Sequence, residues 1–80
     1  MAPVLKTLTG LVVRKPYAVG SKSEHLAVAL QTPRGTYRLR RLEGEPRQDL
    51  ELECLVGSIV RATGELVHGI TFIAHTLTKL

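Results

Sequence analysis

Apolar and polar residues alternate along most of this chain, which is the period expected of half-buried β-strands. In residues 25–32, for example, Leu26, Val28 and Leu30 share one face of such a strand. The alternation predicts five strands, over residues 4–15, 25–32, 36–42, 58–66 and 69–77. Turn residues separate the second strand from the third (Pro33-Arg34-Gly35) and the fourth from the fifth (Val67-His68-Gly69).

The first predicted strand contains Gly10 near its middle. Leu8 and Val12 share one parity whereas Leu11 and Val13 share the other, so the apolar face is expected to switch near this glycine. A glycine in such a position is typical of a bulge or sharp coil, where a strand bends to serve two sheets or to turn the corner of a barrel. Pro16 is expected to end the strand.

Residues 43–57 fit either a strand or a short helix. Apolar residues alternate at positions 50, 52, 54 and 56, yet those at 52, 55 and 56 share one side of a helix. The helix is favoured, because Pro46 suits its start, three acids suit its positive end, and Gly57 suits the residue beyond its last turn. Cys54 is expected in the core.

The predicted order is therefore long strand, strand, strand, short helix, strand, strand. This order, with a glycine-bent first strand and a fourth strand Val60-Arg61-Ala62-Thr63-Gly64-Glu65-Leu66, resembles the OB-fold, a five-stranded Greek-key barrel. The fold class is thus mainly β, and an SH3-like barrel is the alternative. The resemblance covers nearly the whole chain and indicates no particular family within the fold.

Length and composition limit the classes of protein to consider. Eighty residues predict a single domain, 1–80, with a small core and little room for an enclosed catalytic cleft. A lone cysteine excludes an internal disulfide and favours a reducing compartment, so a cytoplasmic location is expected. Neither a signal peptide nor a membrane anchor is expected, because the longest uncharged stretch near the end, residues 66–78, is too short to span a bilayer.

Charge is distributed unevenly along the chain. Up to Leu42 there are eight Lys or Arg residues and one acid, whereas from Glu43 onward there are six acids and three bases. The net charge of +4 therefore combines a basic part of +7 with an acidic part of −3. Clustered guanidinium groups on one face attract phosphate, so this asymmetry favours an anionic partner such as nucleic acid.

The third predicted strand carries the densest part of the basic cluster. If Leu39 points inward, so does Tyr37, and Arg38 and Arg40 point outward next to Ala27 and Ala29 of the second strand. The resemblance to the OB-fold implies that this face holds oligonucleotides, with help from the loops between the first and second strands and between the fourth and fifth. The candidate nucleic-acid-binding residues are Arg14, Lys15, Tyr17, Lys22, Arg34, Arg38, Arg40 and Arg41.

Aromatic residues are scarce, and this scarcity limits the expected affinity. Single-strand binders stack bases on exposed rings, but Tyr37 and Phe72 are expected in the core, which leaves Tyr17. Binding of single-stranded DNA or RNA is therefore expected to be weak and sensitive to salt. A face of solvated charges that binds nothing is the competing interpretation.

Protein association is the second functional hypothesis. The small residues Ala27 and Ala29 would let a partner approach closely, and the acidic segment 43–53 could pair with the basic strand of another copy. The chain would then be a protein-interaction module or a homo-oligomer with no nucleic-acid role. An acidic helix that faces solvent is the simpler interpretation of the segment.

Catalysis, metal binding and cofactor binding are not expected. His25, His68 and His75 fall in three separate elements, without the short spacing of a metal site. Ser58 and Cys54 have no recognisable base, and the glycines form no phosphate-binding loop. The sequence therefore predicts a non-enzymatic binding module with no cofactor.

Overall fold

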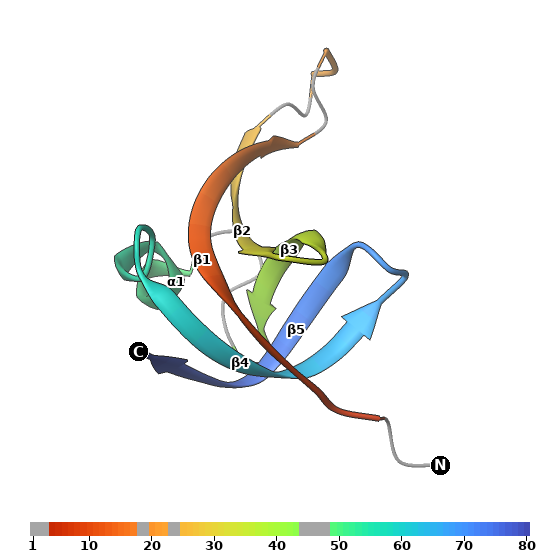
Figure 1. Ribbon diagram of the computed structural model, residues 1–80. Helices are drawn as coiled ribbons and strands as arrows, with labels where there is room; N and C mark the ends of the chain where they lie inside the picture. Colours follow the sequence, from red (N-terminus) through yellow and green to blue (C-terminus); the bar gives the residue numbers. More distant parts are fainter. Residues whose placement is uncertain (1–3, 18–19, 23–24, 44–48) are drawn as a thin grey trace.

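Five strands close into one barrel-like sheet in the computed structural model, which describes residues 4–17, 20–22, 25–43 and 49–80 (Figure 1). The elements in chain order are β1 (Lys6–Tyr17), β2 (His25–Thr32), β3 (Gly35–Arg41), α1 (Leu50–Cys54), β4 (Ile59–Val67) and β5 (Thr71–Lys79). The predicted mainly β class, with one short helix between the third and fourth strands, is confirmed.

The strands do not follow one another around the sheet in chain order. Their order is β1-β2-β3-β5-β4, and β4 pairs with β1 to complete the closure. All neighbouring strands are antiparallel except β3 and β5, which run parallel from Arg38↔Thr71 to Arg41↔Ala74. The crossover through α1 places β4 on the far side of β5 and next to β1 (Figure 1).

The core is formed by one parity of each strand. Its largest fully buried side chains are Phe72, Leu30, Val12 and Val60. Each such side chain contributes roughly 1.5–3 kcal/mol on burial, so these four supply much of the hydrophobic stabilisation. Leu39 lies in the same core and the half-buried Tyr37 packs against it, which confirms the predicted inward parity of β3.

The predicted switch of apolar face at Gly10 is wrong. Leu8 packs against the core and Val12 is fully buried, whereas Leu11 is exposed and Val13 is half-buried, so the inward parity runs unchanged through the strand. What changes at this point is the partner strand. β1 pairs with β4 up to Leu11 and with β2 from Leu11 onward, so one strand serves both halves of the barrel as expected.

Gly10 permits a close approach of two backbones at this bend. A Cβ atom added to it would lie 2.2 Å from the carbonyl oxygen of Gln31, which no side chain tolerates. The β-bulge lies elsewhere, where the register between β4 and β5 shifts at Thr63 and Gly64 and leaves His75 as the extra residue. An added Cβ on Gly64 would lie 2.0 Å from the carbonyl oxygen of Ile73.

Pro16 does not end β1, which continues to Tyr17 and pairs with the start of β2. The amide of Val12 donates to Ser58 and its carbonyl accepts from Gly57, so its backbone groups face the β4 side of the strand. By alternation, the nitrogen of Pro16 faces the same side, where β1 has lost its partner. A missing N–H costs little there, and proline is tolerated.

The helix α1 covers one end of the barrel. Asp49 caps its first turn by accepting from the amides of Glu51 and Leu52, and Leu52 is buried against the core. Gly57, expected beyond the last turn, has a φ of +91°. The expectation that Cys54 lies in the core is wrong, because its side chain is exposed. Pro46, expected to start the helix, lies outside the described residues.

Both predicted hairpin turns are present. Pro33 and Arg34 connect β2 to β3, where the hydroxyl of Thr32 donates to the carbonyl of Gly35. His68 and Gly69, both with positive φ, lie between β4 and β5. Of the helices in the described part of the chain, none is long and apolar enough to cross a membrane.

Candidate nucleic-acid interface

One row of side chains crosses the outer surface of four strands. The register pairs Val13 of β1 with Ala29 of β2, Ala29 with Arg38 of β3, and Arg38 with Thr71 of β5. Paired residues share a face of the sheet, and the residues that alternate with these, such as Leu30 and Leu39, are in the core. Arg38 therefore points outward, as predicted.

Arg38 lies over the ring of Tyr17. Its guanidinium carbon is 5.6 Å from the ring centroid, within the range of a cation–π interaction. Burial raises the pKa of the Tyr17 hydroxyl above its ordinary value, and the positive charge of Arg38 opposes that rise. Tyr17 was expected in the first loop, but it is the last residue of β1, where pairing with β2 fixes its position.

Arg40 and Lys15 extend the same outer face. Arg40 lies two residues beyond Arg38 in β3 and is half-buried, and Lys15 is exposed on β1 opposite Ala27. Within the described part of the chain, neither Arg38 nor Arg40 forms an ion pair with a carboxylate. We call the outward residues Lys15, Tyr17, Arg38 and Arg40 the basic face.

The floor of alanines is less open than expected. Ala29 is fully buried although it lies on the outer side of β2, because the larger residues Val13 and Arg38 flank it in the register. Ala27 is half-buried. A partner that docks here would therefore contact arginine and lysine side chains before it reached the alanines.

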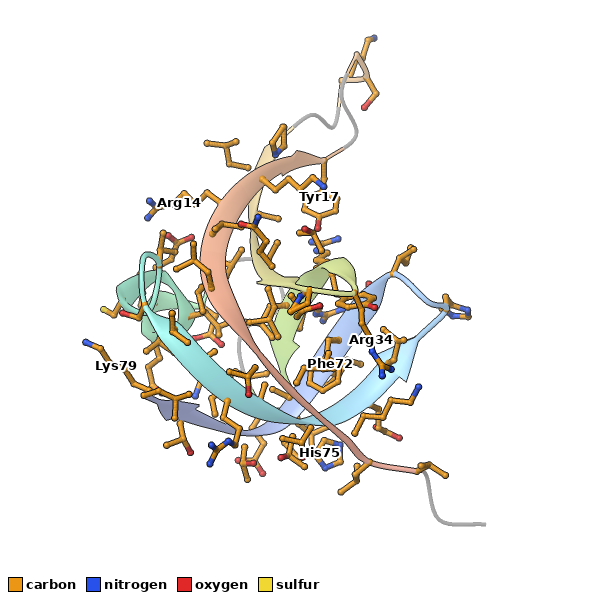
Figure 2. All side chains as sticks on the ribbon, in the orientation of Figure 1. Arg14, Tyr17, Arg34, Phe72, His75 and Lys79 are labelled. Carbon is orange, nitrogen blue, oxygen red and sulfur yellow. The ribbon has the colours of Figure 1, made fainter. Side chains whose placement is uncertain are left out.

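Arg14 does not belong to the basic face. It shares the inward parity of Val12, but it lies beyond the barrel end, where it meets α1 instead of the core. Its Nε donates to Glu53 Oε2 at 3.0 Å, and its Nη2 forms an ion pair with the same oxygen. Figure 2 shows Arg14 and Tyr17 on different sides of β1.

Arg41 is also engaged by the helix. Its Nε and Nη2 donate to the two carboxylate oxygens of Asp49 at 2.6 and 2.8 Å, and its Nη1 donates to Glu51 at 2.6 Å. The hydrogen bond from Arg41 holds the pKa of the Asp49 carboxyl below its usual range, and the same bond raises the pKa of Arg41. Arg41 thus anchors the cap of α1.

Lys22 and Arg34 are exposed in two different connections. Lys22 lies in the loop between β1 and β2, and Arg34 lies in the turn between β2 and β3. Tyr17 pairs with His25 at one end of β2 while this turn follows Thr32 at the other, so Arg34 and Tyr17 lie apart (Figure 2). The structure therefore brings Lys15, Tyr17, Arg38 and Arg40 together and leaves the other four candidates outside this cluster.

Sequence reasoning missed both pairings of arginine with acids of the helix. A signal for them existed, since the acidic segment follows the basic strand directly and the acids occupy the first turn of the helix. It also missed the cation–π contact between Arg38 and Tyr17, for which strand alternation alone gives no signal.

The other candidate chemistry is dispersed. His75 of β5 contacts Glu65 of β4, with 3.2 Å between Nε2 and Oε2, and His68 lies in the exposed turn between these strands. In the described ranges, no group of three or more His, Cys, Asp and Glu side chains is arranged to hold a metal ion. A groove of about 430 Å³ lies between α1, the end of β3 and β5.

Comparisons were made with protein-family models, with curated proteins and with solved structures. None of them matches this chain. The geometry of the basic face is therefore the guide to function.

Proposed function

We propose that this chain is an OB-fold barrel that binds single-stranded nucleic acid, DNA or RNA, on its basic face. The fold assignment is supported by the strand order, the parallel pairing of β3 with β5, and the position of α1 between β3 and β4. Barrels of this kind bind oligonucleotides on the face of strands 2 and 3 and in the adjoining loops. The basic face takes its residues from β3 and from the end of β1, which lie on either side of β2 in the sheet.

The observation that carries the proposal is the position of the Arg38 guanidinium over the ring of Tyr17, on a face where neither Arg38 nor Arg40 is paired with a carboxylate of the described residues. A guanidinium plane and an aromatic ring both stack on nucleobases, and each stacked base contributes roughly 1–3 kcal/mol. Lys15 and Arg40 flank this pair and supply charges for the phosphates on either side. One stacking platform with three charges fits a short, weakly bound segment of single strand.

The distribution of acids supports this proposal over charge-driven self-assembly. Asp49, Glu51 and Glu53 of the acidic segment are bound within the molecule to Arg41 and Arg14. A second copy would have to break these ion pairs before those carboxylates could reach its basic face. The same ion pairs keep the acids away from Arg38 and Arg40, which leaves these arginines available to phosphate.

Fluorescence anisotropy of labelled single-stranded DNA and RNA tests the proposal, with titrations at low and at near-physiological salt. Each phosphate neutralised contributes a slope of about −0.7 to the logarithm of affinity against the logarithm of salt concentration. Replacing both Arg38 and Arg40 with Ala should lower affinity and reduce the slope by about 1.4.

A matched double variant controls for net charge. Lys6 and Arg61 are exposed on β1 and β4, away from the basic face, so replacing both with Ala removes the same charge and should leave most of the affinity. Tyr17→Ala should weaken binding more than Tyr17→Phe, because phenylalanine keeps the stacking surface. Absence of binding at low salt, or equal losses in the two double variants, would contradict the proposal.

A further inference from the structure

The second half of β5 has a partner strand on one side only. Its pairing with β3 ends at Arg41↔Ala74, where the amide of Leu42 donates to the carbonyl of Ala74. The strand then continues to Lys79, paired with β4 alone. Among the described residues, none pairs with the other edge of residues 75–79. Within the described part of the chain, this segment is thus a free edge of the sheet.

The direction of the backbone groups on this edge follows from one hydrogen bond. The amide of Leu80 donates to the carbonyl of Ile59, so the groups of Leu80 face β4. Backbone groups alternate in an antiparallel strand, so those of Thr78 face β4 as well, and those of Leu77 and Lys79 face the free edge. The backbone N–H and C=O groups of Leu77 and Lys79 are thus available to pair with another strand.

The groove described above lies directly beside this edge. Its lining combines apolar residues with carboxylates: Leu42, Leu55, Ala74, Leu77, Glu43 and Glu51, together with Arg41, His75 and Thr76. Arg41 pairs with both Asp49 and Glu51, one positive charge against two negative ones, and Glu43 adds a further negative charge, so the groove keeps a negative balance. The groove would therefore favour a strand that carries an apolar side chain and a positive charge.

We propose that the free edge of β5 pairs with the same edge of a second copy of this chain. The two strands would run antiparallel across a two-fold axis at Thr78, which pairs the edge-facing Leu77 of one copy with the edge-facing Lys79 of the other. Lys79 of each copy would then lie opposite Leu77 of its partner, a residue that lines the acidic groove. Lys79 projects outward from this end of the strand (Figure 2).

Apolar exposure supports the same register. Leu42 and Leu80 are 56% and 58% exposed and lie at opposite ends of the free edge. In the antiparallel arrangement each Leu80 lies opposite Thr76 of the other copy, two residues beyond the Ala74 that binds its Leu42. The two leucines would then lose contact with water in each copy. We therefore identify the occupant as the same strand of a second copy. Its Lys79 matches the negative charge of the groove, and its Leu80 matches the exposed apolar residue at the rim.

Five paired residues bury less than the roughly 800 Å² per partner of a typical stable complex, so the dimer is expected to be weak. Sedimentation equilibrium from about 10 µM to about 1 mM should show a monomer converting to a dimer. Amide hydrogen exchange should show Leu77 and Lys79 gaining protection as concentration rises. Thr76 and Thr78 should be protected at every concentration, because β4 already binds them.

Two variants of Lys79 locate the interface. Lys79→Pro removes an N–H that faces the edge, so it should abolish the dimer while the far-ultraviolet circular dichroism of the barrel is retained. Lys79→Glu should weaken the dimer about tenfold or more, Glu51→Lys in the same chain should restore it, and the exposed loop variant Lys22→Glu should have no effect. A chain that is monomeric at about 1 mM, or a dimer that Lys79→Pro and Lys79→Glu leave unchanged, would overturn the proposal.

Discussion

Closure of the barrel depends on the absence of a side chain at Gly10, and Gly10→Ala tests this dependence. The added methyl group would lie 2.2 Å from the carbonyl oxygen of Gln31 and 3.1 Å from a methyl group of Thr32. The oxygen belongs to the backbone of β2, which pairs with β1 at Leu11↔Gln31. The clash therefore cannot be relieved by rotating a side chain, and the two strands have to separate by about 1 Å.

The expected loss of stability follows from this separation. Overpacking of a tight site costs about 1–3 kcal/mol, and two strained ladder hydrogen bonds add about 1 kcal/mol each. Loss of backbone entropy in the unfolded chain returns about 0.4–1 kcal/mol for a glycine replaced by alanine. The net loss is about 3 kcal/mol, a large part of the roughly 4–12 kcal/mol expected for 80 residues. The melting temperature should fall by about 12–24 °C.

Thermal and urea unfolding, followed by circular dichroism, measure this loss against Gly57→Ala. Gly57 has a φ of +91° but nothing within 4 Å of its added Cβ, so alanine there introduces backbone strain without a clash, about 1 kcal/mol. Gly10→Ala should be clearly the more damaging of the two. If it were as mild as Gly57→Ala, β1 and β2 would not approach as closely as the argument requires.

Two further predictions concern α1. In Asp49→Asn the cap acceptor stays but the charge bound to Arg41 is lost, which should cost about 1–3 kcal/mol at pH 7. Because the pKa of Asp49 is lowered in the folded state, its contribution is complete above its unfolded pKa and disappears as pH falls through the folded value, so urea unfolding across the acid range should show a steeper loss in the native chain than in the variant. Cys54 should react with a thiol reagent in the folded protein nearly as fast as in urea, and protection of the native thiol would place it in the core after all.

The strands and their order along the chain could be predicted from the sequence because alternation is a local property. Residues 25–32 and 36–42 alternate cleanly around a Pro-Arg-Gly turn, and the inward positions of Leu30 and Leu39 follow at once. Gly10 was located correctly but interpreted wrongly. The apolar residues Leu11 and Val13 suggested a second inward face, whereas they lie on the outside of a strand whose neighbours change.

The helix could be predicted in kind but not in orientation. Cys54 follows Leu52 by two residues, which is about 200° around a helix, so a helix that buries Leu52 must expose Cys54. The site was predicted in part for a related reason. Alternation places Arg38 and Arg40 outward, but the engagement of Arg14 and Arg41 depends on where α1 docks, and docking is a tertiary property that strand periodicity does not contain.

The pairing of β1 with β4 also determines when this chain can fold. Lys6 lies opposite Gly64, so residues near the start of the chain wait for a partner nearly sixty positions later. During synthesis the first hairpin can form early, but its β1 edge stays open until β4 and β5 have left the ribosome. Folding dominated by such distant pairs is slow, typically milliseconds to seconds. In that interval the unpaired β1 edge is open to pairing with other chains.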